Sequence, residues 1–225
     1  MPAIIPDISV CAVFNRRPQT AAPMLRSIEE DADPVAVEIF LANIGTENDD
    51  ELLLEFPRLK LFSLPGCREN EAHKQIIELA AGRYILLMAA DAVIHPGSLL
   101  PLVNFMDDNP DTGLASPRVL NAYGRPEAVA RLFPRGLSSL GLCLGLPLSR
   151  RLPAPNPDHN TEVDWLWSGA LIIRPQLIED IGLPRRRLSP LSLMLYARRA
   201  QKEGWHIFYV HEAAVIHPNP LYYAR

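Results

Sequence analysis

Cysteine is scarce in this chain of 225 residues: there are three, at positions 11, 67 and 143, and none belongs to a CxxC pair. We therefore expect neither a zinc site with the usual spacing nor a disulfide framework, and the cysteines should be reduced. The N-terminus also lacks the basic-then-apolar pattern of a signal peptide. Both absences favour a cytoplasmic protein.

Long apolar runs and an excess of positive charge are missing as well. No apolar run approaches the roughly 18–20 residues that span a bilayer, so we expect no transmembrane segment. The net charge of -4 argues against bulk attraction to nucleic acid, although Arg185, Arg186 and Arg187 form a local basic cluster. Neither GxGxxG nor GxxxxGKS/T follows the first apolar segment, which disfavours an unrelated Rossmann-like nucleotide binder.

The composition is that of a packed α/β protein. Apolar residues make up 48% and charged residues 21% of the chain, which excludes disorder, and the length allows one domain with a sizeable core. Short β-rich apolar runs alternate with amphipathic helical segments, which predicts a largely parallel sheet. We expect strands at 8–14, 35–42, 59–64, 84–88, 114–120, 170–173, 205–210 and 213–217, and helices around Met24, over 70–81, between Ser98 and Asn109, around Ile178 and over 193–203.

Residues 82–100 form the stretch around which the chain is organised. Its apolar run, 84–88, is long enough for a strand buried on both faces, and a lone carboxylate, Asp91, stands where that strand should end. Ligands of open α/β sheets sit beyond the carboxyl ends of the strands, so Asp91 is the first candidate site residue. The alternative is a solvated turn residue.

Several other segments each allow two interpretations. The polar loop 43–50 is a nucleotide contact or a solvated turn. Trp165 and Trp167 are core anchors or a sugar-stacking surface, and His217 is a metal ligand or a packed polar residue. The uncharged stretch 136–149, flanked by arginines, covers the core or rests on a membrane surface, and its lack of a polar face favours the core.

Five segments, in order, resemble those of the family 2 nucleotide-sugar glycosyltransferases, especially the rhamnosyltransferase-like branch. They are ISVCAVFNR, AAGRYILLMAADAVIHPGSL, SPRVLNAYGRPEAVARLFP, EVDWLWSGALIIRPQLIEDIG and GWHIFYVHEAAVIH. ISVCAVFNR resembles the family's opening strand with its Asn-Arg ending. The segment that contains Asp91 resembles the one bearing the family's metal and diphosphate carboxylate, and the last segment resembles its closing strands with a terminal histidine. The resemblance covers nearly the whole chain.

The resemblance implies a GT-A fold, which is a Rossmann-like α/β sandwich. It implies a single domain over 1–225, with a nucleotide-binding half at 1–120 and an acceptor-side half at 121–225. The implied reaction is inverting transfer of a sugar from a nucleoside-diphosphate donor to a hydroxyl, in glycan or polysaccharide biosynthesis. A lipid-linked acceptor, with the protein peripheral at a membrane, is conceivable from the uncharged stretch 136–149.

The resemblance also implies roles for particular residues. Asp91 and His217 would hold Mg²⁺ or Mn²⁺, which bridges the phosphates and neutralises charge as the diphosphate leaves. The remaining positions are Asn15, Asn43 and Thr46 on the donor side, and Trp165, Trp167 and Gly169 on the acceptor side.

The chain departs from the family pattern at three places. Ala42 stands where the family has an aspartate that grips the nucleobase, and residues 71–74, Glu-Ala-His-Lys, replace an Asn-rich pattern. The family's Glu-Asp pair falls at residues 191–194, where Ser192 and Leu193 cannot act as the general base.

These departures leave two hypotheses. In one, the chain is a working glycosyltransferase with an unusual acceptor or a displaced base, for which Asp164 or, more weakly, His159 is the candidate. In the other, it is a GT-A-shaped protein without catalysis that binds a nucleotide or a partner protein as a regulatory or scaffolding subunit.

Overall fold

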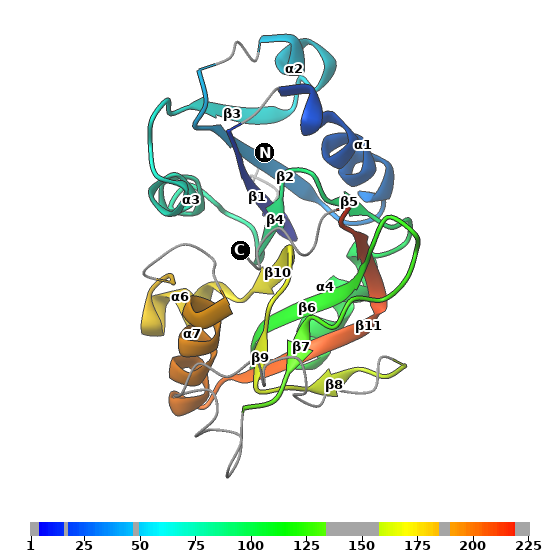
Figure 1. Ribbon diagram of the computed structural model, residues 1–225, viewed down its shortest axis with the longest axis vertical. Helices are drawn as coiled ribbons and strands as arrows, with labels where there is room; N and C mark the ends of the chain where they lie inside the picture. Colours follow the sequence, from blue (N-terminus) through cyan, green and yellow to red (C-terminus); the bar gives the residue numbers. More distant parts are fainter. Residues whose placement is uncertain (1–4, 16–17, 47–49, 134–157, 185–189, 219–225) are drawn as a thin grey trace.

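A sheet with helices on both faces forms the molecule (Figure 1). The computed structural model describes residues 5–15, 18–46, 50–133, 158–184 and 190–218. In spatial order the sheet contains β3 (Leu59–Ser63), β2 (Val37–Asn43), β1 (Ile8–Phe14), β4 (Tyr84–Ala89), β10 (Ala170–Ile173), β6 (Thr112–Leu120), β11 (His206–Ile216) and β5 (Val93–Ile94). β8 (Thr161–Glu162) pairs with β11, and β7 (Ala130–Arg131) pairs with β9 (Trp165–Leu166) in a separate ribbon.

Most strands of the sheet point the same way. β1 pairs in parallel with β2 and β4, β2 with β3, and β6 with β11. β10 runs antiparallel between β4 and β6. The mostly parallel sheet predicted from the alternation of strands and helices is therefore confirmed. As a consequence, β1, β2, β4 and β11 all end at one edge, where β10 begins; we call this the carboxyl edge, and the opposite one the amino edge.

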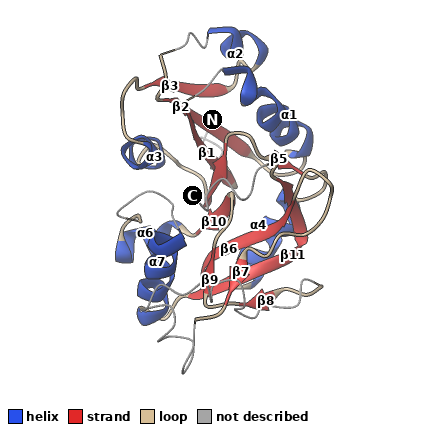
Figure 2. Ribbon diagram, viewed as in Figure 1, coloured by secondary structure: helices blue, strands red, loops and turns tan. Residues whose placement is uncertain are grey.

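Helices cover both faces of the sheet, as Figure 2 shows. α1 (Ala22–Asp31), α2 (Asp50–Glu55) and α4 (Leu99–Asp108) share one hydrophobic core with the sheet, whereas α3 (Glu69–Ile77), α6 (Pro175–Ile181) and α7 (Pro190–Lys202) share the other. Successive strand residues alternate between these cores: Leu86 belongs to the first, and Ile85 and Leu87 to the second. This period of two, with both faces covered, explains why β4 is apolar throughout.

One expected helix end is corrected. The sequence predicts that Gly82 caps the helix over 70–81, but α3 ends at Ile77 and Glu78 is its C-cap. Gly82 instead donates its N–H to Ser9 Oγ at 2.8 Å, and an added Cβ would lie 2.5 Å from Ser9 N. The glycine is therefore required for close approach to β1, not for a helix turn.

Two further differences concern element boundaries. The strands expected at 205–210 and 213–217 are one strand, β11, with a register shift between Val210 and Ala214 where the alternation of apolar residues breaks. The polar loop expected at 43–50 is shorter, because α2 begins at Asp50, where two acidic residues suit a helix N-terminus. The uncharged stretch 136–149 lies outside the described residues.

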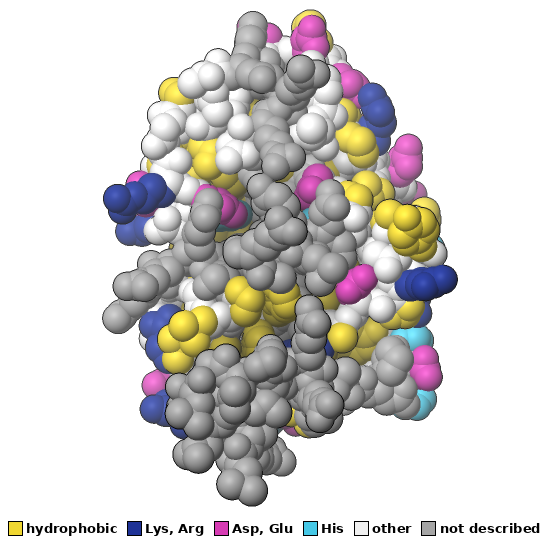
Figure 3. Space-filling model, in the orientation of Figure 1, with side chains coloured by type: hydrophobic (Ala, Val, Ile, Leu, Met, Phe, Trp, Pro, Cys, Tyr) yellow, Lys and Arg dark blue, Asp and Glu magenta, His cyan; other side chains and the backbone are white. Residues whose placement is uncertain are grey.

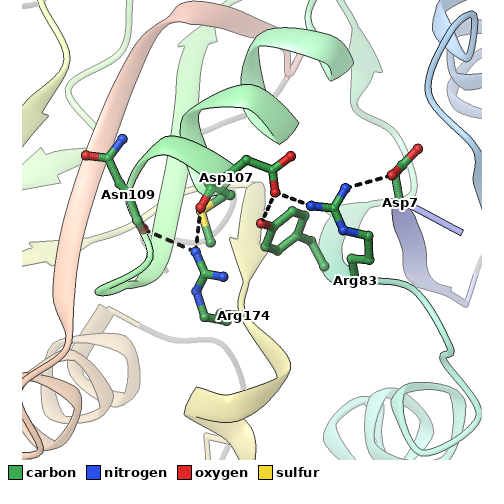
Figure 4. A network of polar contacts seen from close by, with 7 residues as sticks. Asp7, Arg83, Asp107, Asn109 and Arg174 are labelled. Atoms are coloured by element: carbon green, nitrogen blue, oxygen red, sulfur yellow. Dashed lines mark hydrogen bonds and ion pairs between the residues drawn. The ribbon is translucent and has the colours of Figure 1, made fainter. Parts of the chain in front are cut away.

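The amino edge is held by a connected set of polar side chains (Figure 4). Arg83 donates to Asp7 at 2.9 Å and to Asp107, and Tyr84 OH donates to Asp107 at 2.6 Å. Burial and the hydrogen bond to Asp107 raise the pKa of Tyr84. Beside them, Arg174 donates to three carbonyl oxygens: those of Met106, Asn109 and Thr112.

A carboxylate from α1 supports the segment that follows Asp91. Asp31 accepts backbone N–H groups from Gly97, Ser98 (3.0 Å) and Leu99 (2.8 Å). It therefore caps the N-terminus of α4 from a neighbouring helix, where a negative charge and a hydrogen-bond acceptor are both favourable. Ser27 Oγ accepts the N–H of Ile94 at 3.0 Å and ties β5 to the same helix.

Among the described residues on the face seen in Figure 3, side chains of both charges are visible. The visible Lys and Arg side chains (dark blue) are scattered near the outline and do not gather into one patch. Within the described ranges, no helix has both the length and the apolar character needed to cross a bilayer.

Candidate functional site

The carboxyl edge brings together residues from both ends of the chain. Asn15 follows β1, and Asp91 lies two residues after the end of β4. The segment 43–46 begins with Asn43, the last residue of β2. Gly169 precedes β10, and His217 follows β11. Parallel strands place these ends side by side, so most of the residues that the sequence nominated meet at one edge.

Asp91 and His217 are in contact at this edge. Asp91 Oδ1 lies 3.1 Å from His217 Nε2, although 126 positions separate the two residues. The Asp91 side chain is 50% exposed, whereas that of His217 is 1% exposed. The pair therefore combines an imidazole fixed by packing with a carboxylate that faces solvent, and together they present one oxygen and one nitrogen ligand atom.

Gly169 lies next to His217, and a side chain at this position would be in ordinary van der Waals contact with the imidazole. A Cβ at position 169 would lie 3.4 Å from His217 Nδ1 and 3.6 Å from Ala89 Cβ. The Gly169 carbonyl accepts the N–H of Ala89 at 2.7 Å, and the Leu120 carbonyl accepts the N–H of His217 at 2.8 Å. The backbone on either side of the imidazole is thus fixed by strand pairing.

The segment after β2 packs against the end of β1. Asn43 is 1% exposed, and its Oδ1 accepts the N–H of Gly45 at 2.9 Å, which closes a local turn. Ile44 donates its N–H to the Phe14 carbonyl. Asn15, which follows β1, and Thr46, which follows Gly45, are both exposed. Asn43 therefore shapes the loop, and Asn15 and Thr46 are the side chains available to a ligand there.

The expected acceptor-side residues differ in their surroundings. Trp165 is 7% exposed and belongs to the second core, and Trp167 is half-buried against the same core. Asp164 Oδ2 accepts the N–H of Phe133, so this carboxylate helps to hold the β7–β9 ribbon. On α7, Leu193 is buried and Ser192 half-buried.

His73 lines a cavity near the carboxyl edge. In the sequence it was noted only as part of residues 71–74, which depart from the family's Asn-rich pattern. The cavity, of about 30 Å³, lies between α3 and the sheet and is lined by Val13, Glu69, His73, Leu87, Met88, Ala89, Ser168, Gly169 and Leu171. His73 is 9% exposed, and burial lowers its pKa. The signal in the sequence was the spacing: His73 shares the buried face of α3 with Ala72, Ile76 and Ile77.

Comparison with solved structures identifies the fold as GT-A-like. GalNAc-T7, in a crystal structure with UDP, GalNAc and Mn²⁺, aligns with a TM-score of 0.70 and 15% identity, over 96% of this chain and 44% of that one. S. aureus TarS 1-349 aligns with a TM-score of 0.63 and 14% identity, over 95% of this chain and 61% of that one. The chain thus spans less than two thirds of either structure.

The family follows from the sequence itself. A family model described as "Glycosyl transferase family 2" matches residues 9–145, which is more than half of the chain. The chain therefore belongs to glycosyl transferase family 2. No curated protein matches it significantly by sequence.

Proposed function

We propose that the chain transfers a sugar from a nucleoside-diphosphate donor to a hydroxyl acceptor. The observation that carries the proposal is the contact between Asp91 and His217 at the carboxyl edge of the sheet. Charged donors of this kind need a group that neutralises the diphosphate as it leaves. A solvent-facing carboxylate beside a buried imidazole supplies the ligand atoms for such a group.

The two side chains fit a divalent cation. Carboxylate oxygens suit both Mg²⁺ and Mn²⁺, and the imidazole nitrogen favours Mn²⁺. A bound cation would neutralise the negative charge that develops on the leaving diphosphate. Over the described ranges no third His, Cys, Asp or Glu joins the pair. We infer that phosphate oxygens and water supply the other ligands.

The donor's other parts can be assigned along the same edge. Asn15 and Thr46 are the exposed polar groups near the ends of β1 and β2, and we assign them to the nucleoside. Trp167 and Gly169 are half-buried residues of the chain's second half, and we assign them to the acceptor side. The site then lies where the nucleotide-binding half, 1–120, meets the acceptor-side half, 121–225.

A second candidate function is nucleotide binding without transfer, in a regulatory or scaffolding subunit. It is favoured by the surroundings of the two positions at which a general base was expected. Asp164 is held by the Phe133 N–H, and the buried Leu193 stands where the family carries a carboxylate. An inverting transferase needs a base within reach of the acceptor hydroxyl. The two candidates share the donor site and differ in turnover.

Ligand-dependent melting tests the proposal. UDP, TDP, GDP and CDP would each be added with and without Mn²⁺. For one nucleotide with Mn²⁺ we expect a rise in Tm of about 5 °C at a hundred times Kd. Asp91→Asn should abolish the Mn²⁺-dependent part of that rise and change the Tm of the unliganded protein by less than about 1 °C, because the carboxylate is half exposed.

Asp108→Asn is the matched control, since Asp108 is an exposed aspartate at the end of α4. It should keep the full response. A nucleotide response that is independent of both Mn²⁺ and Asp91 would contradict the assignment. A response without release of nucleoside diphosphate from any sugar donor would support the second candidate over the first.

A further inference from the structure

The cavity beside His73 lies between the two parts of the proposed donor site. Its lining includes Val13, two residues before Asn15, and Ala89, two residues before Asp91. It also includes Gly169, which packs against His217. If Asn15 contacts the nucleobase and the Asp91–His217 pair contacts the diphosphate, the chemical group between them is the ribose.

The hydrogen bonding of His73 determines what its ring can offer. Nδ1 lies 3.0 Å from the Glu69 carbonyl oxygen. A carbonyl oxygen only accepts, so Nδ1 carries the proton and Nε2 presents a lone pair. Burial lowers the pKa of His73, which keeps the ring neutral near pH 7. Among the described residues no hydrogen bond to Nε2 is present, although the side chain is 9% exposed.

Nε2 is thus an acceptor without a protein partner among the described residues, in a ring that is largely buried, and a donor group from a ligand or water can bind it. Nδ1 faces the turn of its own helix, so the opposite side of the ring, with Nε2, is the part that can face the cavity. The cavity, at about 30 Å³, has room for one hydroxyl group or one water molecule. Ala89, Ser168 and Gly169, which are half-buried, form its rim on the side of the proposed donor site.

We propose that His73 is a donor-binding residue whose Nε2 accepts a hydrogen bond from a ribose hydroxyl of the bound nucleotide. The inference rests on the proposed function, because it uses the assignment of the nucleoside and the diphosphate to this edge. It adds a residue that comes from α3, beneath the edge, and that carries no motif. The proposed hydrogen bond requires a neutral His73 ring, since an imidazolium has no lone pair on Nε2 and could not accept it.

The experiment compares two nucleotides on three forms of the protein by calorimetry. The nucleotides are the one of UDP, TDP, GDP and CDP that binds most tightly with Mn²⁺ and its counterpart without ribose hydroxyls. On the wild type, we expect the counterpart to bind about tenfold more weakly, because it cannot donate the hydrogen bond to His73 Nε2. His73→Leu should weaken the parent nucleotide about tenfold and leave the counterpart unchanged.

Two further variants make the result specific. His73→Gln places an amide oxygen near the position of Nε2 and should recover most of the discrimination between the two nucleotides. His206→Gln is the control, because His206 is a half-exposed histidine paired with Glu162 at the amino edge. It should behave as the wild type.

The possible outcomes distinguish a failure of this inference from a failure of the proposed function. Equal weakening of both nucleotides by His73→Leu, or equal binding of both by the wild type, would mean that the cavity holds only water and would overturn this inference alone. Absence of binding by all four parent nucleotides would overturn the proposed function and this inference with it.

Discussion

The two edges of the sheet use polar side chains in opposite ways. At the amino edge, Asp107 binds both Arg83 and Tyr84, and Arg174 donates hydrogen bonds to backbone carbonyls (Figure 4). At the carboxyl edge, the Asp91 carboxylate is half exposed, and His73 lines a cavity. Both edges contain charged groups at strand ends, but those of the amino edge are joined in one network of hydrogen bonds and ion pairs, whereas at the carboxyl edge the Asp91–His217 pair is separate from His73 and its cavity.

The difference separates stability from binding. Polar groups that bind one another in a closed network stabilise the fold, whereas groups that face solvent or a cavity can also bind a ligand. Substitutions at the amino edge should therefore lower the free energy of unfolding and leave nucleotide affinity intact. Substitutions of Asp91 should do the reverse. The following predictions test this separation.

Arg174→Met should have the largest effect on stability. The guanidinium donates to the carbonyls of Met106, Asn109 and Thr112, two of which lie at the C-terminus of α4, where a positive charge is favourable. Methionine keeps part of the apolar stem but removes the three guanidinium hydrogen bonds, and of the three carbonyls that of Asn109 still accepts the N–H of Thr112. We expect a loss of about 3 kcal/mol in the free energy of unfolding, measured by urea denaturation.

The control for this prediction is Arg125→Met, at an exposed arginine in the turn after β6. It should change the free energy of unfolding by less than about 0.5 kcal/mol. If Arg174→Met also weakened nucleotide binding by the folded protein, the two edges would be coupled, and the separation proposed here would be wrong.

The sequence predicted the architecture and one side of the site, but not the contacts between distant segments. Alternating apolar runs were sufficient for the α/β order and for placing Asp91 at a strand end. The partner of Asp91 could be nominated only by resemblance, because His217 is 126 positions away. The cavity at His73 depends on β10, which is inserted antiparallel between β4 and β6, and no local pattern reveals that pairing.

The support of α4 by Asp31 shows the same limit. An aspartate near the end of a predicted helix has no local partner in the sequence, yet it accepts three N–H groups from residues 97–99. Only the packing of α1 beside β5 creates this cap. Sequence periodicity predicts which face of each helix is buried, but not which polar groups of a neighbouring element that helix will contact.

Asp31→Asn should have the next largest effect. The amide keeps one acceptor oxygen but loses the negative charge at the N-terminus of α4, and its NH₂ group faces backbone N–H donors. We expect a loss of about 2 kcal/mol, together with faster hydrogen exchange at residues 93–99. Asp111→Asn, at an exposed aspartate before β6, is the control. Unchanged exchange at residues 93–99 would show that the cap does not hold this segment.

Substitution of Glu38, at the start of β2, should have the smallest effect on the free energy of unfolding and the clearest dependence on pH. Burial alone would raise the pKa of its carboxyl, but hydrogen bonds from Lys60, Ser9 and the Ala81 N–H lower it overall. The folded state therefore favours the carboxylate more than the unfolded chain does. This contribution to stability is present above the unfolded pKa of about 4.3 and is lost as the pH falls through the lower folded value.

Glu38→Gln should accordingly destabilise the protein by about 1 kcal/mol at pH 7, and the difference from the wild type should shrink below about pH 4. Urea denaturation over this pH range measures both quantities. Glu78→Gln, at a side chain that is 61% exposed and forms a surface ion pair with Lys74, should show almost no difference at any pH. A Glu38→Gln difference that stayed constant from pH 7 to acid would mean that shape, and not charge, stabilises this corner of the amino edge.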